Sequence, residues 1–547
     1  MILGRAGAGA IILAAASAAA VPTWASAETF DLLIRNGTVI DGTGKPGFRA
    51  DVGVRGGRIV LVGPSAGAKA DKVIDASGLV VAPGFIDAHN HMPEEAPTAK
   101  APFLDEQFLT QGVTTVLAGP DGRFSPTQLR NVLDALERKG SGTNYACYIG
   151  MNGIRQEVIG RAQRAPTAEE LERMKAMVRE GMEMGCVGLS TGLMYEPAMF
   201  SRTDEVVALA REVRPFDGTY DSHTRDPVID MLASEKEAID VGVAAGIPPK
   251  LGHLKAVGLT NKGRIGEVIA LVEETRRAGI EAVADQYPYD GAATTNLKDV
   301  LIFPGTPPRT RLSLEQVQAK LRAALADPAA KTRLRDATNK GEAGGFSWVK
   351  AVGYGSMRIV DAPGRTDLVG QNVQLLAERD KQDPFDLVAR LVLDSKSDMM
   401  ITLGSVDEAD VQKLLLQPWV MVASDGTPMS YSPHPRSTGT FTRVLGRYSR
   451  DLKLLPLEEA VRKMTSLPAD HLRLYDRGRL MAGQVADITV FDPLTVSDRS
   501  NYVQPELLST GIVDVFVNGV AVIRGGKVTG AAPGKFARRL ARPKAAD

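Results

Sequence analysis

The 547-residue chain is poor in the side chains that most often bind transition metals, with six histidines and two cysteines. It also has no excess of one charge, because 65 basic residues balance 65 acidic ones. Without a basic surplus, nucleic acid is not an expected partner. Cys147 and Cys186 form no Cys-x-x-Cys pattern, which excludes a cysteine-rich metal site.

Long apolar runs are missing apart from one near the amino terminus, from about Ala6 to Ala20. At roughly 15 residues it is shorter than the about 20 that a membrane-spanning helix needs. Arg5 precedes the run, and Ala25-Ser26-Ala27 follows it as a small-residue cleavage site. We therefore expect residues 1–27 to be a secretory signal peptide, with a retained anchor as the alternative. The mature protein would be periplasmic or secreted, with no stable membrane insertion.

The two cysteines could form one disulfide in an oxidising compartment. Each of them, however, lies in an apolar, strand-like run, Cys147 within 145–149 and Cys186 within 186–189. This setting favours buried free thiols. We therefore expect thiols and keep the disulfide as the alternative.

Both ends of the mature chain have the pattern of small antiparallel β structure. From residue 28 to about 82, short apolar runs alternate with turns such as Asn36-Gly37 and Gly56-Gly57. The same pattern returns at 486–491 and 513–519. Isolated pieces of three or four strands bury little surface on their own. We therefore expect residues 28–82 and 478–535 to form one small composite β-sandwich domain.

The middle of the chain, residues 83–477, alternates strand-like segments with amphipathic helical ones. Thr167 and Glu170 form a capping-box signature at the start of one such helix. The pattern predicts an α/β fold, namely a (β/α)8 TIM-type barrel, with a doubly wound open sheet as the competing architecture. Eight candidate strands end near His89, Gly119, Gly150, Thr191, His223, His253, Tyr289 and Ser424.

One segment, residues 291–357, breaks this alternation. It contains three prolines between positions 304 and 308, a helix predicted over 314–326 and a glycine-rich strand pair predicted near 344–357. Structureless loops of this length are uncommon inside a compact domain. We expect an inserted subdomain after the seventh strand, which is either a lid over the barrel mouth or a plain surface insertion.

Polar residues that can bind a metal occur where these strands end. His89 and His91 point to the same face, because strand side chains two residues apart do so. Asp121 and Asp425 each also fit an ordinary turn, but in a (β/α)8 barrel all the strand ends of one kind meet at one rim. Imidazoles and carboxylates suit zinc or a similar divalent ion. The residues predicted to converge are His89, His91, Asp121, His223, His253 and Asp425.

Motifs along nearly the whole mature chain resemble the amidohydrolase superfamily, and within it the N-acyl-D-amino-acid deacylases (D-aminoacylases). The resemblance implies a metal-dependent enzyme that hydrolyses the amide bond of N-acyl-D-amino acids or of small peptides with a terminal D-residue. The matching segments are 83–91, 111–116, 188–193 with Tyr195, 222–226, 252–255, 285–289, 424–426, 433–436 and 483–493.

The resemblance also implies a role for each site residue. His89 and His91 would bind one metal position, and His223 and His253 the other. Asp425 would act as general base and then as general acid, or else serve only as a metal ligand. The substrate α-carboxylate would bind Lys255, Tyr287 and Arg436, with Tyr195 as a further contact. Arg436 could instead brace a loop, and Tyr287 could be a core residue.

The chain departs from the family pattern in two turns. The deacylases bridge their two metal positions with a cysteine in Gly-Asn-Cys-Gly, whereas this chain has Gly119-Pro120-Asp121-Gly122. A carboxylate is a harder ligand than a thiolate, which shifts selectivity from zinc toward manganese or cobalt and leaves one or two ions per chain. The family turn Gly-His-Gly-Thr is replaced by Gly150-Met151-Asn152-Gly153, which changes the shape of the substrate pocket.

Two other functions fit the same residues. Another amidohydrolase activity, such as a dipeptidase, cyclic-amide hydrolase or lactonase, would share the metal chemistry. A non-catalytic, metal-free binding protein on the same scaffold would lack a ligand or a base. Here only the cysteine is replaced, and by another competent ligand. We therefore predict a hydrolase with a small-molecule substrate.

Overall fold

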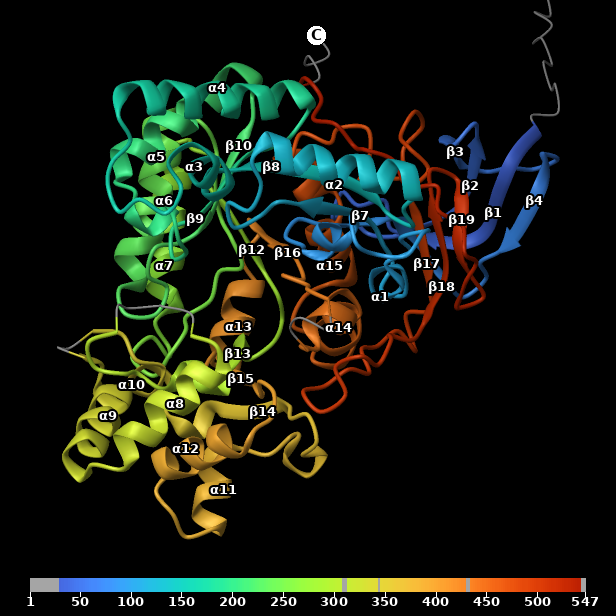
Figure 1. The fold of residues 1–547 in the computed structure, drawn as a ribbon. Coiled ribbons are helices and arrows are strands. Elements are labelled where there is room, and N and C mark those ends of the chain that lie inside the picture. Colours follow the sequence, from blue (N-terminus) through green and yellow to red (C-terminus); the bar gives the residue numbers. More distant parts are fainter. Residues whose placement is uncertain (1–28, 307–311, 343–344, 429–432, 543–547) are drawn as a thin grey trace, which may run out of the picture.

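A computed structural model describes residues 29–306, 312–342, 345–428 and 433–542, and every structural statement below refers to these residues (Figure 1). The predicted signal peptide, residues 1–27, lies outside them. Among the described residues, no helix combines the length and the apolar character that crossing a membrane requires.

Strands from both ends of the chain form one nine-stranded sheet. It consists of β1 (Thr29–Val39), β2 (Phe48–Arg55), β3 (Arg58–Gly63), β4 (Lys69–Asp75), β5 (Val80–Pro83), β17 (Ile488–Phe491), β18 (Ile512–Val517), β19 (Val520–Arg524) and β20 (Lys527–Val528). The order is β20-β19-β18-β17-β5-β1-β2-β3, with β4 paired to β1. The junction is the antiparallel pair of β5 and β17, so the blue and red ends of the chain meet in Figure 1. Buried residues of both ends, such as Val81 and Ile488, share one core.

Eight parallel strands form the barrel. They are β6 (Phe85–Asp87), β7 (Val113–Ala118), β8 (Asn144–Gly150), β9 (Gly188–Gly192), β10 (Thr219–His223), β11 (Pro249–Leu251), β12 (Val283–Gln286) and β16 (Val420–Val422). Neighbours follow chain order from β6 to β12, and β16 pairs with β12. Just beyond β6 and β16 the chain closes the ring, because the Asp425 N–H donates to His89 O at 2.9 Å. The predicted TIM-type barrel is confirmed.

Helices cover the outside of this barrel. Thr167 caps one of them, and its side chain and that of Glu170 form the predicted capping box. The helices that precede or follow barrel strands are α1 (Glu106–Leu109), α2 (Pro126–Lys139), α3 (Met151–Ile159), α4 (Ala168–Met184), α5 (Thr203–Ala210), α6 (Met231–Ala245), α7 (Ile265–Arg277), α13 (Glu408–Leu415), α14 (Arg436–Arg443), α15 (Leu457–Met464) and α16 (Ser466–His471).

The inserted segment forms its own layer beside the barrel, in yellow and orange in Figure 1. Its sheet has the order β13-β15-β14. The central strand β15 ends at Gly404, so the insertion extends well past residue 357. Its role as a lid stays a prediction. Its elements are β13 (Gly291–Asn296), α8 (Leu314–Leu325), α9 (Pro328–Lys340), α10 (Trp348–Val352), β14 (Met357–Asp361), α11 (Val373–Arg379), α12 (Pro384–Asp394) and β15 (Met400–Gly404).

Two expectations about local structure are wrong. Residues 348–352 form helix α10 rather than part of a strand pair, and Ser347 caps that helix by accepting the Lys350 N–H. Cys147 and Cys186 form a disulfide rather than free thiols, with their Cα atoms 4.7 Å apart. Cys147 lies in β8, and the residue after Cys186 donates its N–H to Cys147 O at 2.8 Å. The sequence separation of 39 residues hides this closeness, which arises because β8 and β9 are neighbours.

Candidate active site

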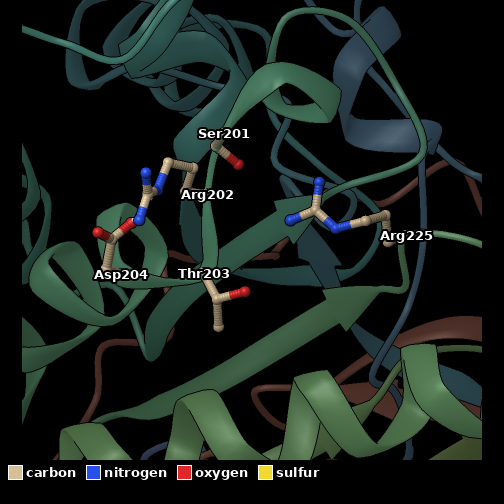
Figure 2. A pocket seen from close by; sticks show the side chains of 5 residues that line it. All are labelled: Ser201, Arg202, Thr203, Asp204 and Arg225. Carbon is tan, nitrogen blue, oxygen red and sulfur yellow. Dashed lines mark hydrogen bonds and ion pairs between the residues drawn. The ribbon is translucent and has the colours of Figure 1, made fainter.

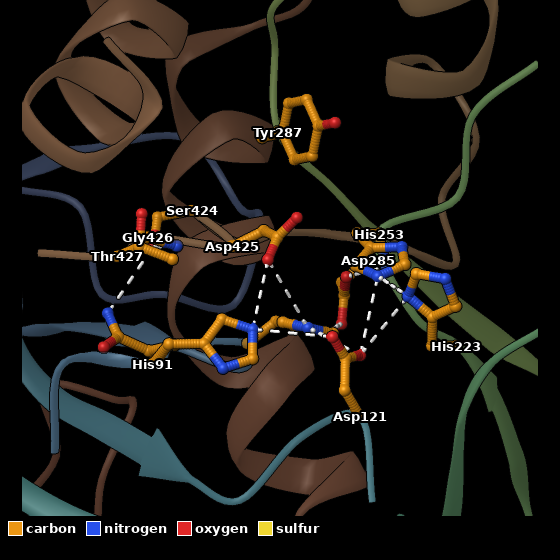
Figure 3. Close-up of polar contacts among 12 residues, drawn as sticks. His91, Asp121, His223, His253, Asp285, Tyr287, Ser424, Asp425, Gly426 and Thr427 are labelled. Carbon is orange, nitrogen blue, oxygen red and sulfur yellow. Dashed lines mark hydrogen bonds and ion pairs between the residues drawn. The ribbon is translucent and has the colours of Figure 1, made fainter. Parts of the chain in front are cut away.

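The six predicted metal-binding residues lie together at the carboxyl ends of the barrel strands. Figure 3 labels five of them, all except His89. The histidine rings form a chain of neighbours, with centroids 5.5 Å apart for His89 and His91, 4.7 Å for His89 and His253, and 4.5 Å for His253 and His223. Asp121 and Asp425 hold left-handed backbone conformations, with φ of 56° and 47°. Such conformations cost about 1–3 kcal/mol for residues other than glycine and cluster at functional sites.

Asp121 lies among all four histidines. Its Oδ1 atom is 3.4 Å from His89 Nε2, 3.5 Å from His253 Nε2 and 3.6 Å from His223 Nδ1. Its Oδ2 atom is 3.6 Å from His91 Nε2. Both oxygens of this carboxylate therefore face imidazoles.

Asp425 lies on the opposite side of His89 and His91. Its Oδ1 atom is 3.3 Å from His91 Nε2 and 3.8 Å from His89 Nε2. Its Oδ2 atom pairs with Arg436 Nη1 at 2.7 Å. One carboxylate oxygen therefore faces the histidines and the other faces a cation.

The residues present fit a divalent ion. His89 is fully buried, and neither of its ring nitrogens has a hydrogen-bond partner; Asp121 Oδ1 is also buried without one. An unsatisfied buried polar atom costs about 1–3 kcal/mol, which a bound cation would remove. One set of possible ligand atoms comes from His89, His91 and Asp425, and another from His89, Asp121 and His253. Within each set the atoms lie within 4.8 Å of one another.

The charge states of Asp121, Asp425 and His253 suit metal binding. Burial alone would raise the pKa of Asp121, but the charge of His223 and the close contacts with the other histidines hold it well below its ordinary value. For Asp425 burial is likewise outweighed, mainly by the charge of Arg436, and its pKa is well below the usual range. Burial and the charge of Lys255 lower the pKa of His253 to about 3. Ionised carboxylates and a neutral imidazole are the forms that bind cations.

The four predicted substrate-binding residues reach the same region. Lys255 Nζ is 2.9 Å from His253 Nδ1, and Tyr195 Oη is 3.5 Å from His223 Nδ1. The centre of the Tyr287 ring lies 5.0 Å from Lys255 Nζ and 4.8 Å from Arg436 Cζ. The Tyr287 hydroxyl donates to Ala292 O at 2.8 Å, so this tyrosine also contacts the first strand of the insertion.

A second layer of charged residues supports the histidines and was not singled out from the sequence. Asp285 Oδ1 accepts the His253 N–H at 2.5 Å, and its Oδ2 is 3.6 Å from His89 Nδ1. Lys250, which is fully buried, donates a hydrogen bond to Asp285. Glu94 Oε1 lies 2.7 Å from His91 Nδ1. Only their positions in the sequence could have indicated these residues. Asp285 lies in a segment that matches the family, and Glu94 follows His91 by three residues.

Figure 2 shows the residues that line a surface hollow of about 450 Å³. Its lining residues are Ser201, Arg202, Thr203, Asp204 and Arg225. Arg202 pairs with Asp204 at 3.3 Å and Arg225 with Glu237 at 2.9 Å. None of the predicted site residues lines it, and its arginines are already paired.

Comparison with known proteins places this fold and site in a family. Residues 370–528 match the model of the amidohydrolase family. The chain is 34% identical to D-aminoacylase of Alcaligenes xylosoxydans xylosoxydans over 541 residues, covering 94% of this chain and 99% of the relative. A crystal structure of D-aminoacylase superimposes with a TM-score of 0.75 at 32% identity, covering 93% of this chain and all of the other.

A further solved relative was determined with ligands. It is the N-acyl-D-glutamate deacylase of Bordetella bronchiseptica, complexed with zinc and a phosphonate mimic of the tetrahedral intermediate. Its TM-score is 0.74 at 31% identity, again over 93% of this chain and 100% of that one. Fold and sequence together define an amidohydrolase, an enzyme that hydrolyses amide bonds with the help of a metal. Within that class the chain belongs to the D-aminoacylase family, as its motifs predicted.

Proposed function

We propose that this protein hydrolyses the amide bond of N-acyl-D-amino acids, or of small peptides with a terminal D-residue, to a carboxylate and a free D-amino acid. The observation that carries the proposal is the buried His89, whose unpartnered ring nitrogens lie within a cluster of histidines and aspartates. The relatives named D-aminoacylase and N-acyl-D-glutamate deacylase support the D-configured substrate.

In this proposal the metal is held by the six residues that meet at the rim. His89 and His91, with Asp425, would hold one position, and His223 and His253 the other. Asp121, which lies near all four histidines, would contact both. Zinc is the expected ion, with manganese or cobalt as alternatives because a carboxylate replaces the family cysteine. A bound divalent ion supplies a Lewis acid for the amide carbonyl and lowers the pKa of water.

The cationic residues bind and orient the substrate. Arg436 presents a planar fork that suits a carboxylate, and Lys255 supplies a second positive charge. The Tyr287 ring lies close to both cations. Fixing the α-carboxylate here and the scissile carbonyl at the histidines leaves one direction for the side chain, which selects one enantiomer. Tyr195 adds a contact beside His223.

Asp425 moves the proton. Water attacks the amide carbon, and Asp425 accepts the proton that the water loses. The same proton then passes to the leaving nitrogen as the C–N bond breaks, so that the amine departs neutral. When a substrate carboxylate engages Arg436, Asp425 Oδ2 loses its present partner and becomes available for this transfer.

The proposal is tested with a substrate panel on metal-analysed protein. We expect N-acetyl-D-amino acids to be hydrolysed and their L-enantiomers to be much poorer substrates. Cyclic amides, lactones and L-dipeptides in the same panel represent the other amidohydrolase activities. Protein that holds no divalent ion and stays inactive after metal addition would support the non-catalytic alternative instead.

The role of Asp425 has its own test. We expect Asp425→Asn to lose at least about 10³-fold in kcat, within the range that general acid–base groups and their partners contribute. Its metal content should stay close to that of the wild type, because the other five predicted ligand residues are unchanged. Normal turnover by this variant would refute the assignment.

We also propose that the protein is exported, on the basis of the apolar run and the Ala25-Ser26-Ala27 site. Amino-terminal sequencing of protein recovered from the host's extracytoplasmic fraction should begin at Glu28. Recovery only from the cytoplasm with residues 1–27 intact would contradict it.

A further inference from the structure

Glu94 connects two parts of the site that come from different strands. It lies in a short 3-10 helix, Met92–Glu95, directly after His91. Its Oε1 atom is 2.7 Å from His91 Nδ1, and its Oε2 atom is 3.2 Å from Arg123 Nη1. Arg123 follows Asp121 by two residues in the turn after β7. One carboxylate therefore contacts both segments that carry candidate ligands.

The contact with His91 decides which ring nitrogen is available. A carboxylate at Nδ1 favours a proton there, which leaves the Nε2 lone pair free. Nε2 is the atom that faces Asp425 Oδ1 at 3.3 Å and Asp121 Oδ2 at 3.6 Å.

The contact with Arg123 restrains the other segment. The Arg123 N–H donates to Pro120 O at 3.3 Å, which closes the turn around Asp121. Asp121 is held there with a φ of 56°, a conformation that needs support from its surroundings. The Glu94 side chain is only 14% exposed, so its ion pair with Arg123 is partly shielded from water.

We propose that Glu94 is a positioning residue of the metal site, which orients His91 through Nδ1 and holds the Asp121 turn through Arg123. The inference rests on the proposed function, because it needs a metal at these ligands. Outer carboxylates of this kind typically contribute 10- to 100-fold to metal affinity.

The test compares four variants prepared without metal and then titrated with zinc or cobalt against a competing chelator. Glu94→Ala removes both contacts, and Glu94→Gln keeps an acceptor for His91 but removes the charge. Arg123→Gln breaks only the contact with the turn. Glu95→Gln is the matched control, because Glu95 is the exposed neighbour in the same short helix.

We expect zinc affinity to fall about 10- to 100-fold in Glu94→Ala, less in Glu94→Gln, least in Arg123→Gln and not at all in Glu95→Gln. The visible absorption bands of the cobalt-loaded protein should change in Glu94→Ala and match the wild type in Glu95→Gln, since these bands report on ligand geometry. A purely structural role would lower the unfolding temperature without changing affinity or spectrum.

Two results would overturn the inference. Folded Glu94→Ala that binds zinc as tightly as Glu95→Gln, with an unchanged cobalt spectrum, would show that His91 needs no partner. This leaves the proposed function intact, because the wild type still binds metal. Wild-type protein that binds no divalent ion would contradict the proposed function and the role of Glu94 with it.

Discussion

Two buried polar clusters lie next to each other in the barrel, and they differ in how their charges are satisfied. In the lower cluster, nearer the middle of the strands, Lys250 Nζ lies 3.0 Å from Asp221 Oδ1 and donates to Asp285. In the upper cluster, at the strand ends, the ring nitrogens of His89 have no hydrogen-bond partner. The lower cluster carries its own cation. In the proposed function, a bound divalent ion would complete the upper cluster.

The difference between the two clusters rests on one lysine. His89, Asp221 and Asp285 offer ligand atoms within 4.8 Å of one another, so this set alone would also fit an ion. Lys250 already occupies that neighbourhood, and its charge keeps the pKa of the Asp285 carboxyl below the usual range despite burial. This set of carboxylates and one histidine therefore already has a cation from the chain itself.

The largest expected effect comes from removing the internal cation. Lys250→Met should lower the free energy of unfolding by about 3–5 kcal/mol, because it leaves two buried carboxylates without their partner. Chemical denaturation of the metal-free protein measures this loss. Lys262→Met, at an exposed ion pair with Asp407, is the matched control and should change stability little. Equal losses in the two variants would remove the distinction between the clusters.

The upper cluster should respond to added metal instead. Zinc at 100 times its dissociation constant should raise the free energy of unfolding by about 2.7 kcal/mol, because it binds the folded state. Thermal unfolding with and without zinc measures the gain. At the same zinc concentration, Asp121→Ala should gain much less unfolding free energy. An equal gain in that variant would show that Asp121 does not contact the metal.

The identity of the ion depends on Asp121. Asp121→Cys restores the ligand type of the family turn, and a thiolate favours zinc over manganese. We expect the ratio of zinc to manganese affinity to rise roughly tenfold, about 1.4 kcal/mol. Competition titrations on wild type and variant give this ratio. An unchanged ratio would mean that Asp121 does not set metal selectivity.

The sequence predicts the barrel and the upper cluster for the same reason. Strand ends are visible as polar residues after apolar runs, and in a parallel barrel all such ends meet at one rim. His253 and Asp425 could therefore be placed without knowing their neighbours. Their approach to Asp121 follows from topology, which the alternation of strands and helices already indicates.

The lower cluster could not be predicted in this way. Lys250 precedes an apolar residue within a three-residue strand, and nothing in its sequence indicates that it points into the barrel. Its partners lie on two other strands, 29 and 35 positions away. The disulfide between Cys147 and Cys186 was missed for the same reason, since its closeness depends on which strands are neighbours. The sequence pattern predicts an insertion that ends at residue 357, short of β15. The reason is that β14, α11, α12 and β15 continue the alternation of strands and helices that is typical of the barrel.

Asp105 is a buried carboxyl outside both clusters. Among the described residues, no lysine pairs with it, and it belongs to no candidate metal site. Burial raises its pKa to about 8, against one hydrogen bond from Thr143 that lowers it. Its pKa is higher in the folded chain than in the unfolded chain, so the folded state keeps a proton that the unfolded state has lost. Stability from this group is therefore full below about pH 4 and is lost as pH rises through about 8.

The pH dependence of stability from Asp105 gives the smallest of the predicted effects. Between pH 7 and pH 8 the wild type should lose roughly 1 kcal/mol of unfolding free energy more than Asp105→Asn, which cannot ionise. Asparagine suits the site because Asp105 holds a φ of 52°, a conformation that asparagine tolerates. Denaturation curves of the metal-free proteins at several pH values measure the difference. Parallel pH profiles would mean that Asp105 is ionised in the folded protein, and that a buried carboxylate here needs no cation.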